Sequence, residues 1–166
     1  YHTEYADNGM QKMSVLPIRQ ENMFFGKFVI AALVLSAMAV IEMAVLSGCA
    51  KYWFQSYVFD LAEILKIAGF QIVVTLPTVM LMLVIASACR NMWISLGIGV
   101  ILVFTLSILP QDNAVLSLFP FASPYQIFSA SVENSRAVLF LAACGIETVL
   151  FGIAEVVYLK VRRCFE

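Results

Sequence analysis

Three acidic residues lie inside long apolar runs of this sequence, at Glu42, Glu147 and Glu155. A charged side chain at the centre of a bilayer costs at least about 2.5–3.5 kcal/mol, so residues of this kind are rare unless they bind something or pair with a neighbour. These carboxylates are therefore the first candidates for chemistry. They are suited to holding a cationic ligand or to bonding one helix to another.

Two of the carboxylates are predicted to lie at a similar depth. With both ends of the chain in the cytosol, Glu42 is about seven and Glu147 about nine residues from the outer end of its helix, roughly 10–14 Å at 1.5 Å per residue. We expect them to line one cavity in the outer half of the membrane, as a substrate path. The alternative is that each is protonated or hydrogen-bonded between helices. Glu155 lies nearer the other face, where we expect it to pair with Lys160 or Arg162.

The sequence carries no motif of the common enzyme classes. It has no GxSxG, no HExxH and no metal-ligand cluster, and its one histidine is His2. Gly26-Lys27 resembles the end of a phosphate-binding loop, but Phe28 stands where Ser or Thr is required. We therefore predict no catalytic residue, no metal and no cofactor in this chain. The four cysteines form no CxxC pair and are predicted to be packing thiols: Cys49, Cys89, Cys144 and Cys164.

Four long apolar runs position these residues. Hydrophobic residues make up 62% of the 166-residue chain and charged residues 13%, whereas an average soluble domain is about 45–50% apolar and about 25% charged. Each run is about 18–22 residues long, roughly 27–33 Å as a helix, which is enough to cross the hydrocarbon core. The sequence predicts an all-α, polytopic membrane protein with four transmembrane helices, at about 28–49, 69–89, 92–109 and 138–159.

The distribution of Lys and Arg predicts the orientation. Seven of the ten basic residues fall in the N-terminal stretch, in the linker between the second and third runs, or in the C-terminal tail. Because cytoplasmic loops carry an excess of Lys and Arg, these parts are expected in the cytosol of a plasma-membrane protein, with both ends of this chain inside. The seven residues are Lys12, Arg19, Lys27, Arg90, Lys160, Arg162 and Arg163.

The linker between the third and fourth runs is predicted to enter the membrane without crossing it. Residues 114–131 are apolar, but they are short and interrupted by Pro120 and Pro124. We expect a pair of short helices that dip into the outer leaflet, an outer re-entrant element covered by protein. The alternative is an ordinary external loop whose apolar residues pack on the helix ends.

Two further features concern the second run. Residues 60–69 have a helical apolar pattern and are predicted to lie on the membrane surface before the span begins. Pro77 is expected to kink the second helix, because it removes one backbone hydrogen bond. Arg90 and Asn91 are expected to close a tight hairpin with the third run.

The N-terminal stretch is predicted to present a short amphipathic helix at the cytosolic face. Gly9 and Pro17 delimit this turn, and Met13 and Leu16 are among its apolar residues. Such a helix can dock into a groove on a partner domain, where Arg19 would pair with acidic residues. The alternative is a helix that lies on the membrane surface, anchored by its Lys and Met side chains.

This stretch resembles the cytosolic coupling segment of type 2 ABC transporter permeases. That segment has an acidic residue, a glycine, an apolar turn ending in proline, then Arg or Ser, and a Gly/Ala-Lys pair that enters a helix. The basic tail YLKVRRCFE is also similar to the end of those permeases. The matching positions are Glu4, Gly9, Leu16, Pro17, Arg19, Gly26 and Lys27, with Met13 inside the turn.

The resemblance implies a division into a coupling segment (residues 1–27) and a transmembrane permease domain (28–166). Members typically have six spans, with the coupling segment between the second and third, so this chain corresponds to the later part of a permease and two spans are expected before Tyr1. The short form is most similar to permeases of lantibiotic immunity and of bacitracin-type peptide efflux.

The resemblance also implies a function. The chain would be the permease subunit of an ATP-driven exporter that moves a peptide antibiotic or another amphipathic molecule. Its partners would be cytosolic ATPase subunits, which hold ATP and Mg, and a second permease subunit, identical or homologous. The alternative is a membrane sensor or assembly subunit that transports nothing.

Overall fold

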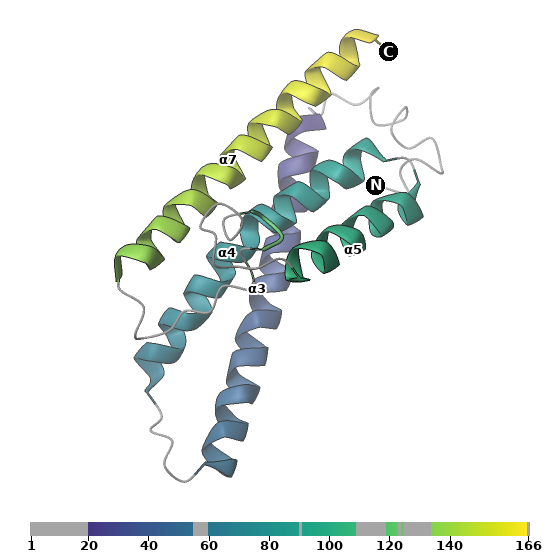
Figure 1. The fold of residues 1–166 in the computed structure, drawn as a ribbon. Coiled ribbons are helices and arrows are strands. Elements are labelled where there is room, and N and C mark those ends of the chain that lie inside the picture. The colour runs from purple at the N-terminus through teal and green to yellow at the C-terminus, as the bar shows by residue number, and fades with distance from the viewer. Residues whose placement is uncertain are drawn as a thin grey trace.

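The computed structural model describes residues 20–54, 60–89, 91–108, 119–122, 124 and 134–165. These residues form four helices and contain no strand (Figure 1). The helices are α3 (Gln20–Trp53), α4 (Leu61–Ala88), α5 (Met92–Ile108) and α7 (Asn134–Phe165). Residues 1–19, which carry most of the predicted coupling segment, lie outside the described residues.

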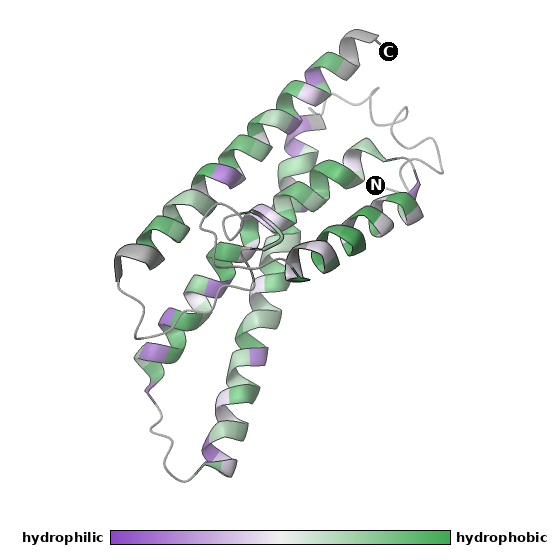
Figure 2. Cartoon of the chain, viewed as in Figure 1, coloured by the Kyte–Doolittle hydropathy of each residue, from purple (hydrophilic) through white to green (hydrophobic). Residues whose placement is uncertain are grey.

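Three of the helices contain stretches long and apolar enough to cross a membrane: Glu21–Trp53, Leu61–Ala88 and Ala137–Val161. Most residues along these helices are hydrophobic (Figure 2). α5 is also apolar, but its 17 residues correspond to roughly 25 Å, somewhat less than the ~30 Å hydrocarbon core. The predicted all-helical, polytopic membrane fold is confirmed, with its third span realised as a shorter helix.

α4 is the centre of the bundle. It packs most extensively against α7, then against α3, and also against α5, whereas α3 and α7 contact each other only sparsely. One core cluster joins Phe70 and Val74 of α4 to Ala137 and Cys144 of α7. Cys144 is fully buried there, as a packing thiol should be, whereas Cys89 is half-buried and Cys49 is exposed.

The surface helix predicted over residues 60–69 is wrong as a separate element. Leu61 begins α4, which continues without a break through Gly69 and Pro77 to Ala88. Asp60 starts the helix by accepting a hydrogen bond from the backbone N–H of Ala62 at 2.9 Å. A glycine inside a helix costs only about 1 kcal/mol relative to alanine, and burial of the residues on both sides of Gly69 offsets that cost.

The hairpin between α4 and α5 is confirmed. Cys89 ends α4, and its N–H donates to the carbonyl of Ile85 at 3.0 Å. Asn91 begins α5, because its side-chain oxygen accepts a hydrogen bond from the N–H of Trp93 at 3.0 Å. Arg90 itself lies outside the described residues.

α4 and α5 approach closely at Gly99. A Cβ added there would lie 2.7 Å from Cε and 2.9 Å from Sδ of Met82 on α4. The Met82 side chain is flexible and can yield to a methyl group, but a larger side chain would have to displace it and the residues packed around it.

Replacing Gly99 with Leu should therefore lower the stability of the solubilised protein by about 1–3 kcal/mol, as overpacking does elsewhere. The thermal midpoint in detergent measures this. Gly97→Leu is the matched control on the same helix, because a Cβ at Gly97 meets nothing within 4 Å. Equal midpoints for the two variants would contradict the close approach at Gly99.

Candidate functional site

The first turns of α3 are anchored between α4 and α7. Phe24 is 1% exposed and packs with Met80 of α4 and Leu159 of α7. Phe28, one turn later, packs against the same cluster. α3 thus begins eight residues before the predicted span, and its first turns carry the end of the predicted coupling segment into the core. Beyond these turns, the most apolar part of α3 has no buried residue.

The linker between α5 and α7 inserts a short segment on another side of α4. Phe121 and Ala122 are each 2% exposed and pack against Leu81 and Met82 of α4 and against α5. The Thr78 hydroxyl donates to the carbonyl of Pro120. Further along, Nε2 of Gln71 donates to the carbonyl of Pro124 at 3.0 Å.

The depth of this insertion follows from its partners. Counted from the α4–α5 hairpin, Leu81 is about seven residues from the end of α4 and Leu102 about ten from the start of α5, roughly 10–15 Å. The described part of the re-entrant element is therefore covered by protein, between α4 and α5 and away from their ends. The rest of residues 114–131 lies outside the described residues, including the predicted pair of short helices.

Two neighbouring turns of α4 hold both of these contacts. Thr78 and Met82 face the inserted segment, while Met80 faces Phe24 and Leu159. Met80 and Met82 lie roughly 200° apart around the helix, at 100° per residue. Any rotation or shift of this part of α4 must therefore act on α3 and on the inserted segment together.

Glu155 has a buried partner on α4. Its side chain is fully buried, and Oε1 lies 2.5 Å from Oγ of Ser87, which is also buried. Ser87 Oγ lies 2.9 Å from the carbonyl of Val84 as well. The predicted pairing of Glu155 with Lys160 or Arg162 stays a prediction, since Lys160 is exposed and the Arg162 side chain lies outside the described ones. The contact between Glu155 and Ser87 joins α7 to α4 close to the hairpin.

The other two carboxylates stand in different surroundings. Glu42 is exposed on α3, whereas Glu147 on α7 is half-buried. Oε2 of Glu147 is buried, and no hydrogen bond to it is found among the described residues. Neither glutamate lines the apolar cavity between α3, α4 and α7. Their role as a shared substrate path stays a prediction, as do the coupling roles of residues 1–19, whereas Lys27 is half-buried in the first turns of α3.

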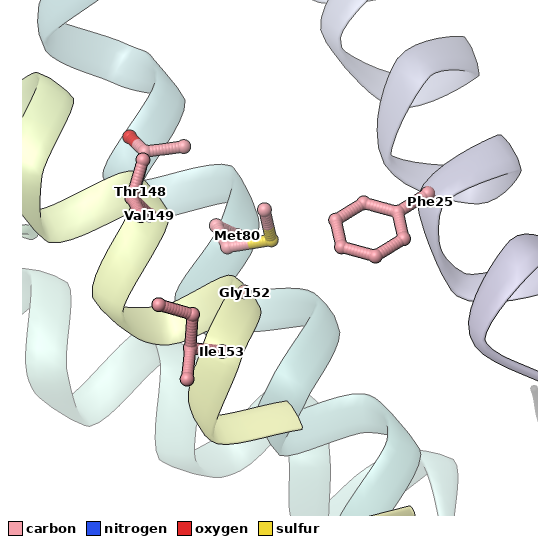
Figure 3. A pocket seen from close by; sticks show the side chains of 6 residues that line it. All are labelled: Phe25, Met80, Thr148, Val149, Gly152 and Ile153. Atoms are coloured by element: carbon pink, nitrogen blue, oxygen red, sulfur yellow. The ribbon is translucent and has the colours of Figure 1, made fainter. Parts of the chain in front are cut away.

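An apolar cavity of about 290 Å³ lies where α3, α4 and α7 meet (Figure 3). In the close view, Phe25 points from α3 toward Met80 of α4, with α7 beside them. Among the described residues, no group of His, Cys, Asp and Glu is arranged to hold a metal ion. The lining residues are Phe25, Met80, Thr148, Val149, Gly152 and Ile153.

Sequence reasoning missed Phe24 and Ser87. Phe24 and Phe28 lie four residues apart on one helix face, which is a signal for packing, but the polar residues before them suggested a cytosolic segment. Ser87 lies 68 positions from Glu155. Nothing in an apolar helix marks one serine among several as the partner of a distant carboxylate.

Replacing Ser87 with Ala should destabilise the protein by about 0.6–1.7 kcal/mol, the range found for hydrogen bonds between membrane helices. A double-mutant cycle with Glu155→Gln, read from thermal midpoints in detergent, should give a coupling free energy of similar size. Ser107→Ala is the control, because Ser107 is exposed and bonds its own helix at the Phe104 carbonyl. If Ser87→Ala cost no more than this control, the Ser87–Glu155 contact would not contribute to stability.

One comparison with known proteins gave a match. A family model described as ABC-2 family transporter protein matches residues 1–106 of the 166, a range that holds the predicted coupling segment, α3, α4 and most of α5. Searches of curated proteins and of solved structures gave no match. The chain belongs to the ABC-2 transporter family, as a transmembrane component of an ABC transporter whose ATP hydrolysis takes place in another subunit.

Proposed function

We propose that this chain is the permease subunit of an ATP-driven exporter that moves a peptide antibiotic or another amphipathic molecule out of the membrane. One observation carries the proposal. The same two turns of α4 contact the start of α3, where the coupling segment ends, and the inserted segment of the linker between α5 and α7.

The cytosolic side of the proposed mechanism is the coupling segment. Residues 1–19 would dock on an ATPase subunit through the apolar turn at Met13 and Leu16, held by Pro17. α3 begins at Gln20, so a displacement of the docked segment would pass directly to Phe24. Phe24 is packed against Met80 and Leu159, and its movement would shift α4 relative to α7.

Toward the outer face, the part that would move in the proposed mechanism is the inserted segment. A shift of α4 would pull on Pro120 through Thr78 and on Phe121 through Leu81 and Met82. Interfaces of this kind tend to have discrete arrangements rather than a continuous range. Two positions of the inserted segment would then correspond to closed and open states of a path to the outer face, and ATP would select between them.

The membrane orientation, a second subunit and the cargo complete the proposed transporter. The seven basic residues on one side favour a plasma-membrane protein with both ends of this chain in the cytosol. A second permease subunit, identical or homologous, would complete the path. Glu42 and Glu147 would meet a cationic cargo. The alternative, a sensor or assembly subunit, has the same family membership but predicts no cargo movement.

Replacing Leu16 with Asp and Pro17 with Gly tests the coupling segment. The change removes the apolar contact and the fixed turn, so the protein should insert normally but lose its ATPase subunit on affinity purification. Gln11→Asp, a charge added at a polar position in the same segment, is the control and should retain the subunit. An undiminished complex in the double variant would contradict the docking role.

Replacing Glu42 and Glu147 with Gln tests the substrate path. Gln keeps the shape and a hydrogen-bonding group but removes the charge, so cell survival against cationic peptides should fall while protein level and ATPase binding hold. The double variant should be little worse than either single one, because both act on one ligand charge.

The matched control for this test is Glu63→Gln, an exposed carboxylate in the first turn of α4. It should leave survival unchanged. Full resistance in the Glu42/Glu147 double variant would exclude a shared charged site and leave a structural role for the two residues. A chain that transports nothing would show no survival difference in any variant, including loss of the whole protein.

A further inference from the structure

The cavity between α3, α4 and α7 lies at a depth where its surroundings are hydrocarbon. Met80 is about eight residues from the end of α4 at Ala88, and Gly152 about nine from the end of the apolar stretch at Val161. These separations correspond to roughly 12–14 Å along the helices. On α3, Phe25 is four residues from the start of the apolar stretch at Glu21, roughly 6 Å. These separations are all shorter than half of a ~30 Å hydrocarbon core, so the cavity lies in the half of the core next to the α4–α5 hairpin.

The lining of the cavity suits an apolar occupant. Thr148 is the one lining residue with a polar side chain, and its hydroxyl donates to the carbonyl of Cys144 at 2.7 Å. A bound water requires two to four polar partners, and this lining does not provide them. A polar or charged ligand would lose its hydration there and gain no hydrogen bond in return.

The shape of the cavity also restricts the occupant. Its volume of about 290 Å³ is about twice that of the ~150 Å³ apolar cavity known to bind benzene, so it holds a stretch of hydrocarbon but no bulky molecule. Val149 and Ile153 are 60% and 56% exposed and Phe25 is 41% exposed. The cavity is thus open sideways, and a chain can enter without separating the helices.

We propose that this cavity binds the hydrocarbon chain of a membrane lipid. At this depth, acyl chains are the molecules that surround an exposed helix face, and the lining offers them contact without any polar penalty. The proposal does not depend on the cargo or on transport. Because α3 and α7 contact each other only sparsely, a bound chain would fill the space between them and support the first turns of α3.

Gly152 sets the space available. A Cβ added there would lie 3.4 Å from Cε of Met80 and 3.7 Å from a ring carbon of Phe25. A leucine at this position would therefore occupy the cavity itself. Gly145, on the same helix, is exposed and has nothing within 4 Å of an added Cβ, which makes it a matched control.

The test is photolabelling of the full chain in vesicles of phosphatidylethanolamine and phosphatidylglycerol that contain a phospholipid with a diazirine at mid-chain. Adducts, located by mass spectrometry, should concentrate on residues 148–153 and on Phe25, above the level at Ile101, an ordinary exposed position of α5. Gly152→Leu should lower this labelling by about tenfold, while Gly145→Leu should leave it unchanged.

A second variant keeps the test decisive if Gly152→Leu fails to fold. Ile153→Ala widens the cavity and should hold labelling at or above that of the unchanged chain. Uniform labelling along all exposed faces would overturn the proposal, as would unchanged labelling in folded Gly152→Leu. A disulfide between Ile153→Cys and a second copy of the chain, formed at the expense of lipid labelling, would also overturn it by showing a protein occupant.

Discussion

The packing of every other element against α4 is the constraint on which this structure depends. Lipid tails are as apolar as leucine, so helices in a bilayer associate through close packing and polar contacts rather than through the hydrophobic effect. α4 takes part in both kinds of contact. Glycines of α5 and α7 meet its Met82 and Met80, and its Ser87 and Thr78 bond Glu155 and Pro120. Without α4, α3 and α7 would share few contacts.

The inserted segment satisfies a second constraint of the bilayer. Non-helical backbone at membrane depth is tolerated only where protein covers it and its polar groups find partners. Proline has no N–H, so Pro120 and Pro124 bring no donor into the apolar interior. Their carbonyls accept from Thr78 and Gln71, and the N–H of Ala122 donates to the carbonyl of Phe119 at 2.8 Å. The two prolines that rule out a spanning helix here also make the insertion less costly.

The sequence was sufficient to predict the membrane fold. Bilayer thickness sets the length of a span, and apolar runs of that length are visible directly in the sequence. It was less informative about the ends of helices. Polar residues before Phe24 and the glycine at position 69 both suggested a boundary, yet packing of the neighbouring residues carries α3 and α4 through these positions. Partners across the bundle were not predictable, since an apolar helix has no polar face to show its rotation. Glu155 was therefore recognised as a candidate, but Ser87 was not.

The three intramembrane carboxylates can now be distinguished by their surroundings. Glu155 is buried against Ser87, and Glu147 keeps one oxygen in the protein interior, whereas Glu42 is exposed on a helix whose most apolar part has no buried residue. A carboxylate facing lipid costs at least about 2.5–3.5 kcal/mol. Another element or a water-filled path over this side of α3 would remove that cost. Of the three carboxylates, Glu42 is therefore the one whose cost the described part of the chain offsets least.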